Sequence, residues 1–284
     1  MINRELNFDT PSPLLYLIAT PIGNLSEMSP RSLEVINQMD YIAAEDTRNA
    51  RKLLSYFKIE KNLISCHEHN EVEAAQYIIK LLKEGKKVAY MSDAGYPCVS
   101  DPGVKLVDKC LEAGIKISTV NGASAAINAL TVSGLDSTHF YFEGFLPVKT
   151  SEKEKELLSL KPRKETLILY ESPHRIGKTL KSLYSVLGER KAVICRELTK
   201  LHEEIIRGTL KEFSEIDENT LIGEMVIVIE GNKEEIQTSE EGIIEFLKSS
   251  DSSKKTKEIV QEAAIKFNVN KNYVYDLYLK KIKD

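Results

Sequence analysis

The chain of 284 residues is 42% hydrophobic and 29% charged, a composition typical of a globular protein large enough for more than one domain. Its net charge of -4 argues against a protein that coats nucleic acid nonspecifically, but allows a local basic face. No apolar run is long enough for a membrane span, residues 1–8 are polar, and four cysteines lack paired spacing, so we expect a reduced cytoplasmic protein without anchor or signal peptide.

Short apolar runs alternate with helical patterns over the first 120 residues. Such alternation, with nearly continuous apolar strands, predicts a parallel sheet covered by helices on both faces. The expected strands are 14–19, 41–44, 63–66, 88–91 and 115–120. The expected helices are 30–39, 50–57, 72–83, a segment from Val104, and a segment that begins at the small-residue corner 121–126 and runs through Leu130.

Beyond Gly134 the pattern changes, because several strands follow one another with only short turns between them. This spacing predicts a mixed sheet. The expected strands are 140–142, 167–170, 192–195, 204–207 and 225–229, with helices at 176–187 and 210–216.

The polar segment 231–241 has the composition of a linker, and helical patterns follow at 243–247, 254–267 and 271–282. Residues 251–284 hold eight lysines and five acids, so the tail is the basic end of an acidic protein. It predicts either a helix-turn-helix-like appendage or a helical hairpin that packs on the body or on a partner subunit. We therefore expect an α/β fold with an N-terminal domain at 13–122, a second domain at 123–231, and a linker with a basic helical hairpin at 232–284.

The segment Ser92–Gly103 directly follows an apolar strand and is rich in Asp, Gly, Pro and Ser. A strand that ends in such residues can form a ligand crevice, because the backbone turns sharply there and approaches a ligand closely. The second half also resembles a helix start, with Ser100 or Asp101 as the N-cap and Pro102 in the first turn. An ordinary turn-rich loop is the alternative.

Two familiar nucleotide motifs are missing. The first turn, Thr20–Leu25, has one glycine and lacks the spacing of a dinucleotide fingerprint, and the chain has no Gly-Lys-Ser/Thr loop. His67 and His69 beside Cys66 would suit a metal ion, but no fourth ligand is evident, so we expect the end of a strand and no metal.

Three polar clusters follow predicted strands. In Ala44–Arg48 the acids suit a helix cap, whereas Arg48 and Arg51 suit phosphate groups. Tyr170–Arg175 and Cys195–Lys200 gather acids, cations and an imidazole. Two such clusters at the ends of adjacent strands favour a site over scattered surface residues.

The ordered motifs between Leu14 and Gly231 resemble the tetrapyrrole methylase superfamily, S-adenosylmethionine enzymes whose cofactor lies between two α/β domains. Among its members they are most similar to the ribosomal RNA small subunit methyltransferase I family, which 2′-O-methylates a cytidine in the decoding centre of 16S rRNA. The motifs are Ala19–Leu25, Ala44–Arg48, His69–Glu71, Ser92–Gly103, Gly122–Ala125, Gly144–Pro147, Glu171–Arg175, Arg196–Lys200 and Gly223–Glu224.

The resemblance implies S-adenosyl-L-methionine as cofactor, 16S rRNA within the small ribosomal subunit as partner, and a homodimer. It places the cofactor against Thr20, Pro21, Asp93, Ala94, Gly95, Tyr96, Gly122, Ser124, Ala125, Phe145, Tyr170 and Met225. The candidates for the base or its tuning partners are Glu171, His174 and Lys200. The candidates for RNA contacts are Arg48, Arg51, Arg175, Lys254 and Lys255.

Two alternatives stay open. One is a methylase of the same superfamily that acts on a tetrapyrrole or another small molecule. The other is a cofactor-binding ribosome assembly factor without turnover.

Overall fold

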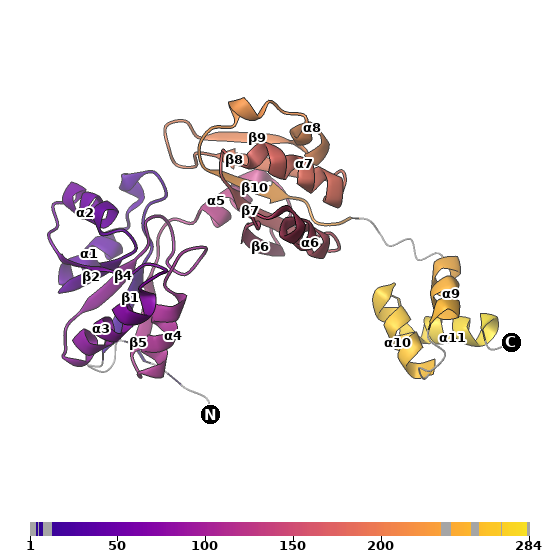
Figure 1. Ribbon diagram of the computed structural model, residues 1–284, viewed down its shortest axis with the longest axis horizontal. Coiled ribbons are helices and arrows are strands. Elements are labelled where there is room, and N and C mark those ends of the chain that lie inside the picture. Colours follow the sequence, from indigo (N-terminus) through magenta and orange to yellow (C-terminus); the bar gives the residue numbers. More distant parts are fainter. Residues whose placement is uncertain are drawn as a thin grey trace. The chain divides into compact units, whose positions relative to one another are not determined.

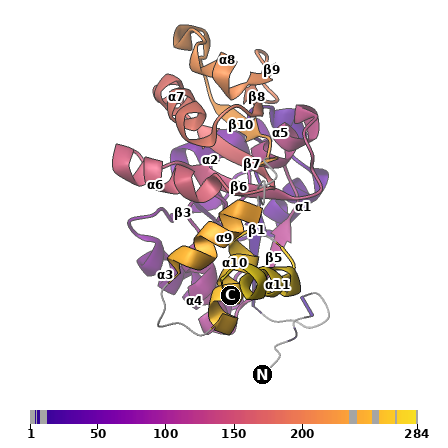
Figure 2. The same cartoon turned by 90° about the vertical axis from the view of Figure 1, so that its right-hand side faces the viewer.

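The computed structural model describes residues 4, 6, 7, 13–233, 240–250, 256–267 and 269–282. The chain forms two compact units, Met1–Gly231 and Asn232–Asp284 (Figures 1 and 2). None of the helices in these ranges is long and apolar enough to cross a membrane. The division of the first unit at residue 122 stays a prediction.

The first sheet of the larger unit is parallel throughout, as expected (Figure 1). Its strands lie in the order β3-β2-β4-β1-β5. They are β1 (Leu14–Ile18), β2 (Tyr41–Ala44), β3 (Asn62–Ser65), β4 (Val88–Met91) and β5 (Lys116–Val120).

Side chains alternate between the two faces of this sheet, so each face has its own apolar core. One core packs helices α1 (Pro30–Gln38) and α2 (Thr47–Tyr56) against the sheet. The other packs α3 (Glu71–Lys83) and α4 (Val104–Glu112). The connections after the neighbouring strands β1 and β4 therefore lead to opposite faces. In an open α/β sheet, a crevice for a ligand forms at the carboxyl ends of two such strands.

The second sheet is mixed, with strands in the order β6-β7-β10-β8-β9. Only β6 and β7 pair in parallel; the other neighbours are antiparallel. The strands are β6 (Phe140–Phe145), β7 (Thr166–Glu171), β8 (Lys191–Arg196), β9 (Glu204–Thr209) and β10 (Met225–Ile229).

Helix α5 (Ala125–Ser133) packs on one face of the second sheet. Helices α6 (Thr150–Leu160), α7 (Ile176–Leu187) and α8 (Leu210–Ser214) form the core of the other face. Short 3-10 turns lie at Leu25–Glu27 and Glu218–Thr220. The sequence analysis missed α6, because its charged segment buries few apolar side chains, Leu157 and Leu160 among them.

The start of α4 corrects one expectation. Neither Ser100 nor Asp101 caps this helix; the N-cap is Gly103, whose φ of +127° disfavours any other residue. Oε1 of the buried Glu71 in α3 accepts hydrogen bonds from the backbone N–H groups of Gly103 (2.9 Å) and Leu106 (3.0 Å). A carboxylate from another helix thus supplies both the cap and the negative charge that a helix start favours.

The smaller unit consists of α9 (Glu240–Ser249), α10 (Thr256–Lys266) and α11 (Lys271–Lys281). Apolar side chains from all three helices form its core, including Ile243, Val260 and Val274. The three helical patterns in the sequence are confirmed; α11 begins at the expected residue, and the other boundaries differ by one to three residues.

Candidate functional site

A cavity of about 370 Å³ lies beside the carboxyl end of β4, between the two sheets of the larger unit. Its size falls within the range of small-molecule sites. Its walls are mostly apolar, with a few carboxyl and hydroxyl groups. The lining residues are Ile22, Ala94, Gly95, Tyr96, Val99, Ser100, Asp101, Ser124, Ala125, Phe145, Tyr170, Glu171, Ser172, Pro173, Cys195, Leu198, Glu224, Met225 and Val226.

Eight of the twelve residues expected to bind a cofactor line this cavity: Ala94, Gly95, Tyr96, Ser124, Ala125, Phe145, Tyr170 and Met225. The other four, Thr20, Pro21, Asp93 and Gly122, are not part of its lining. Pro21 and Asp93 line a separate pocket beside α2.

Thr20 and Gly122 shape the backbone of the cavity wall. Thr20 exchanges two backbone hydrogen bonds with Gly95, of 2.9 and 3.0 Å, and its hydroxyl donates to the carbonyl of Ser92. The N–H of Gly122 donates to the hydroxyl of Tyr96 (3.3 Å). A β-carbon at Gly122 would lie 2.8 Å from the carbonyl oxygen of Ala19, so only glycine fits this approach of two strand ends.

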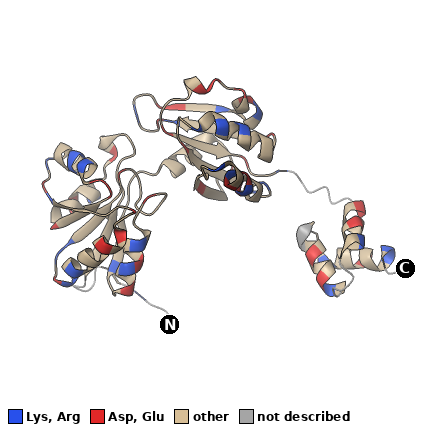
Figure 3. Ribbon diagram, in the orientation of Figure 1, with Lys and Arg blue, Asp and Glu red and all other residues tan. Residues whose placement is uncertain are grey.

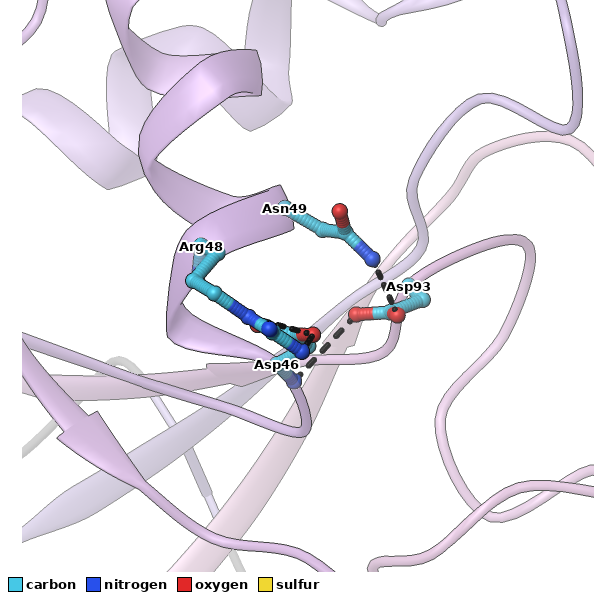
Figure 4. A network of polar contacts seen from close by, with 4 residues as sticks. All are labelled: Asp46, Arg48, Asn49 and Asp93. Carbon is cyan, nitrogen blue, oxygen red and sulfur yellow. Dashed lines mark hydrogen bonds and ion pairs between the residues drawn. The ribbon is translucent and has the colours of Figure 1, made fainter.

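The carboxylate of Asp93 is directed at the start of α2 (Figure 4). It accepts hydrogen bonds from the Asn49 side-chain amide (2.7 Å) and from the backbone N–H of Asp46 (3.3 Å). These bonds join the loop after β4 to the loop after the neighbouring strand β2. Asp93 thus holds the two loops together.

Asp101 is the titratable group of the cavity whose pKa departs furthest from its ordinary value. Burial, together with the carboxylates of Glu45 and Asp93, raises the pKa of Asp101 to about 7. Burial and the charge of Asp93 also raise the pKa of Glu45. Three carboxyl groups that repel one another next to a cavity favour a cationic ligand there.

Glu171 lines the cavity, but its carboxylate is held by the protein. Its oxygens accept hydrogen bonds from the hydroxyl of Thr179 (2.6 Å) and the backbone N–H of Ser172 (2.8 Å). Nε of Arg175 lies 3.2 Å away. Glu171 is 2% exposed, so these three donors fix the position of its carboxylate at the cavity wall.

Lys200 does not line the cavity but contacts Glu224, which does, and lies next to the first turn. Its Nζ contacts carboxylate oxygens of Glu197 and Glu224, each at 2.9 Å. Burial acts against the charge of Lys200, but the hydrogen bonds to these acids outweigh it and the pKa of Lys200 is raised. Lys200 is therefore a cation at neutral pH rather than a base. A β-carbon at Gly23 would lie 2.5 Å from its Cγ, so the side chain lies directly on the first turn.

His174 is exposed and does not line the cavity. Of the expected RNA contacts, Arg48 has an 82% exposed side chain and pairs with Asp46, and Arg51 is exposed on the same helix. Side-chain and backbone hydrogen bonds from Arg48 hold the pKa of Asp46 well below its usual range.

Arg175 is more enclosed than expected. Besides its pairing with Glu171, it donates from Nη2 to the carbonyl of Leu146 (2.6 Å). Lys254 and Lys255 lie outside the described residues.

The sequence analysis missed Asp101 and Glu224 as cavity residues. Asp101 was assigned to a helix cap, and the pairing of β2 with β4 brings Glu45, which follows β2, near the loop that carries Asp93 and Asp101. The sequence did contain a signal for Glu224 as a cavity residue. Glu224 directly precedes β10, and residues at strand ends lie next to the crevice.

The described residues contain no group of three or more His, Cys, Asp or Glu side chains arranged to hold a metal ion. The rings of His67 and His69 lie 6.0 Å apart, edge to face, at the end of β3. Both histidines lie in the turn between β3 and α3, beyond the last residue of the strand.

Residues 14–214 match the family model described as "Tetrapyrrole (Corrin/Porphyrin) Methylases". The chain belongs to the tetrapyrrole methylase family. It is 41% identical to "Ribosomal RNA small subunit methyltransferase I" of Bacillus subtilis (strain 168), over 98% of this chain and 99% of the relative. The relative with the same name from Haemophilus influenzae is 43% identical, over 94% and 96%.

Solved structures confirm the fold of this methylase. The "methyltransferase CobJ" superposes with a TM-score of 0.59 at 16% identity, over 78% of this chain and 94% of that one. The uroporphyrin-III-C-methyltransferase from Thermus thermophilus gives a TM-score of 0.55 at 21% identity, over 77% and 94%. At these identities the likeness concerns the fold alone.

The family implies a methyl donor of the S-adenosylmethionine type, and the cavity fits such a group. Its apolar walls and the rings of Phe145 and Tyr170, 5.6 Å apart, suit an organic ligand. The carboxyl groups around Asp101 suit its positive charge.

Proposed function

We propose that this methylase transfers a methyl group from S-adenosyl-L-methionine to the 2′-hydroxyl of a cytidine in the decoding centre of 16S rRNA. The observation that carries the choice of substrate is the 41% identity, over nearly the whole chain, to a relative named for ribosomal RNA of the small subunit. The exposed cations Arg48 and Arg51 at the start of α2 support an anionic polymer as substrate.

The cofactor would supply a methyl group already activated on a sulfonium, so the protein has to bind, orient and exclude water. We assign binding to the backbone of Ala94–Tyr96 and Ser124–Ala125, with Phe145, Tyr170 and Met225 covering the ligand from the second sheet. Thr20, Asp93 and Gly122 act through the loops they hold. Pro21 lines the separate pocket beside α2 together with Asp93, so we assign it a role in shaping the first turn and not a direct contact from the cavity lining.

A ribose hydroxyl is a poor nucleophile at neutral pH, and the protein must help to remove its proton. Glu171 is held by Thr179, Ser172 and Arg175, so we propose that it positions the turn above the cavity. We propose that the cation of Lys200 stabilises negative charge that develops on the ribose oxygen. His174, although exposed, stays a candidate base.

The RNA partner would be the small ribosomal subunit, bound by Arg48 and Arg51, with Arg175 as a fixed charge near the cavity. Lys254 and Lys255 are proposed as further contacts. From the family resemblance we also propose a homodimer and a cytoplasmic location. Sedimentation of the purified protein tests the oligomeric state.

The test uses radiolabelled S-adenosylmethionine and small subunits from a strain that lacks the enzyme, followed by mapping of the labelled nucleotide. Label on one decoding-centre ribose is the expected result. Tight cofactor binding without label on the subunits would contradict the RNA substrate and favour a small-molecule methylase. Label on a base instead of a ribose would contradict the 2′-hydroxyl acceptor.

Two variants test the assigned roles in the same assay at saturating substrate. We expect Lys200→Met to lower the single-turnover rate about a hundredfold, in line with the loss of one electrostatic donor. His174→Ala decides whether the exposed imidazole is the base: an unchanged rate removes it from the candidates. Lys181→Met on α7, an exposed lysine outside the cavity, is the matched control.

A further inference from the structure

The smaller unit has a groove of its own. It lies between α10 and α11 and has a volume of about 360 Å³. Its residues come from the first turns of α10 and from one face of α11. They are Thr256, Lys257, Val260, Lys271, Asn272, Tyr275, Tyr278 and Leu279.

The charged side chains are unevenly distributed over this unit. The three helices together carry six lysines and six acids, so the described helices are neutral overall (Figure 3). The groove, in contrast, is lined by two lysines and no acid. The charged residues that line the groove are all basic, although the unit is neutral overall. This charge complements an anionic ligand.

The side chains around the groove are partly ordered in advance. Nζ of Lys271 donates to Oε1 of Gln261 (2.6 Å), which holds this lysine at the edge of α10 and leaves further N–H donors on the ammonium group. The hydroxyl of Thr256 donates to that of Tyr278 (3.4 Å), and Tyr278 also packs on the core of the unit. Lys271 and Tyr278, which line the groove, are thus held in place by contacts within the unit.

An aromatic ring stands in the groove beside the cations. Tyr275 is 46% exposed although it lines the groove, so one side of its ring is open to a ligand. A basic groove with an open aromatic ring is the combination that binds single-stranded nucleic acid, since lysines contact phosphates and the ring stacks on a base. Double-stranded RNA offers no free base face for such stacking.

We propose that the α10–α11 groove binds a single-stranded segment of RNA, with a base stacked on Tyr275 and phosphates at Lys257 and Lys271. The inference rests on the proposed function for the identity of the RNA, and it adds a defined groove to the single residues proposed above as RNA contacts. The groove lies in a separate compact unit, so it supplies affinity for the RNA and not chemistry.

The chain offers a matched control for the stacking residue. Tyr273 is on the same helix and is 43% exposed, but it does not line the groove. The full-length protein is titrated against a fluorescent single-stranded oligoribonucleotide of about twelve nucleotides, followed by anisotropy. We expect Tyr275→Ala to weaken binding about tenfold, Tyr275→Phe to preserve it, and Tyr273→Ala to leave it unchanged.

The proposed phosphate contact of Lys257 is tested by the salt dependence of the affinity for RNA. Lys257→Gln should lower the slope of log affinity against log salt by about 0.7, as expected for one lost phosphate contact on a single strand. Lys248→Gln on α9, exposed and outside the groove, should not change the slope. Equal effects of Tyr275→Ala and Tyr273→Ala, or binding of a duplex as tight as that of the single strand, would overturn the proposal.

Methylation separates this inference from the proposed function. With small subunits, Tyr275→Ala should raise the concentration for half-maximal rate and leave the saturating single-turnover rate unchanged. If the wild-type protein does not methylate the subunits, the proposed function fails, but the anisotropy series still decides the groove. If the oligonucleotide affinity is the same in all variants, the groove proposal fails, whatever the methylation result.

Discussion

Asp101 provides the most quantitative test of the site. Its carboxyl group lines the cavity, and burial with the neighbouring Glu45 and Asp93 raises its pKa from 3.8 to about 7. Tyr170 and the thiol of Cys98 are titratable neighbours that stay neutral in this range, since burial raises the pKa of each. The test substitution is Asp101→Asn, which removes the ionisable group and keeps the shape of the side chain.

The direction in which stability changes with pH follows from the number of protons bound by the native and unfolded states. Between pH 4 and pH 7 the native carboxyl holds a proton that the unfolded chain releases, so stability is lost as the pH rises through the native pKa. A shift of about three units corresponds to at most about 4 kcal/mol. Because Asp101 is partly exposed, solvent screening reduces this to about 2 kcal/mol.

The assay is urea unfolding of the ligand-free full chain at about pH 4 and about pH 8, values that bracket the shift. Asp101→Asn should exceed the wild type in free energy of unfolding by about 2 kcal/mol at the higher pH and match it at the lower pH. Asp108→Asn, at an exposed position of α4, is the control. A stability difference that does not change with pH, or that favours the wild type at the higher pH, would refute the electrostatic account.

Two further predictions concern the framework of the site. Glu71→Ala leaves two N–H groups at the start of α4 without their acceptor and should cost about 3 kcal/mol, whereas Glu71→Gln keeps an acceptor and should cost about 1 kcal/mol, both by urea unfolding. Equal losses for the two variants would contradict this account. Gly122→Ala places a β-carbon 2.8 Å from the carbonyl oxygen of Ala19 and should destabilise the protein by about 2 kcal/mol and weaken cofactor binding, measured by calorimetry. Unchanged cofactor affinity would show that this strand end does not shape the cavity.

Local pattern determined much of the fold. Apolar runs bounded by turn residues located all ten strands in the described part of the chain, because a buried strand needs a continuous apolar segment whatever surrounds it. The change from alternating helices to short turns separated the parallel sheet from the mixed one. The exception was α6, whose charged sequence carries too few apolar positions for a clear period.

The position of the crevice also followed from sequence, since polar residues after successive strands gather at one edge of a parallel sheet. The individual cofactor residues were expected from the family resemblance, and eight of the twelve line the cavity. The sequence pattern could not distinguish the side chains that enter the cavity from those that stabilise its loops.

That distinction depends on contacts between residues far apart in the chain. The pairing of β2 with β4 puts Asn49 beside Asp93, and the packing of α3 on α4 puts Glu71 at a helix start. Glu171 is held by Thr179, from the helix that follows its own strand. The sequence by itself determined which segments form strands and helices and beside which strand end the cavity lies, because these depend on local period and on the direction of the strands. Only the tertiary structure decided the role of each carboxylate, because burial and partners set the charge, the pKa and the orientation of an acid.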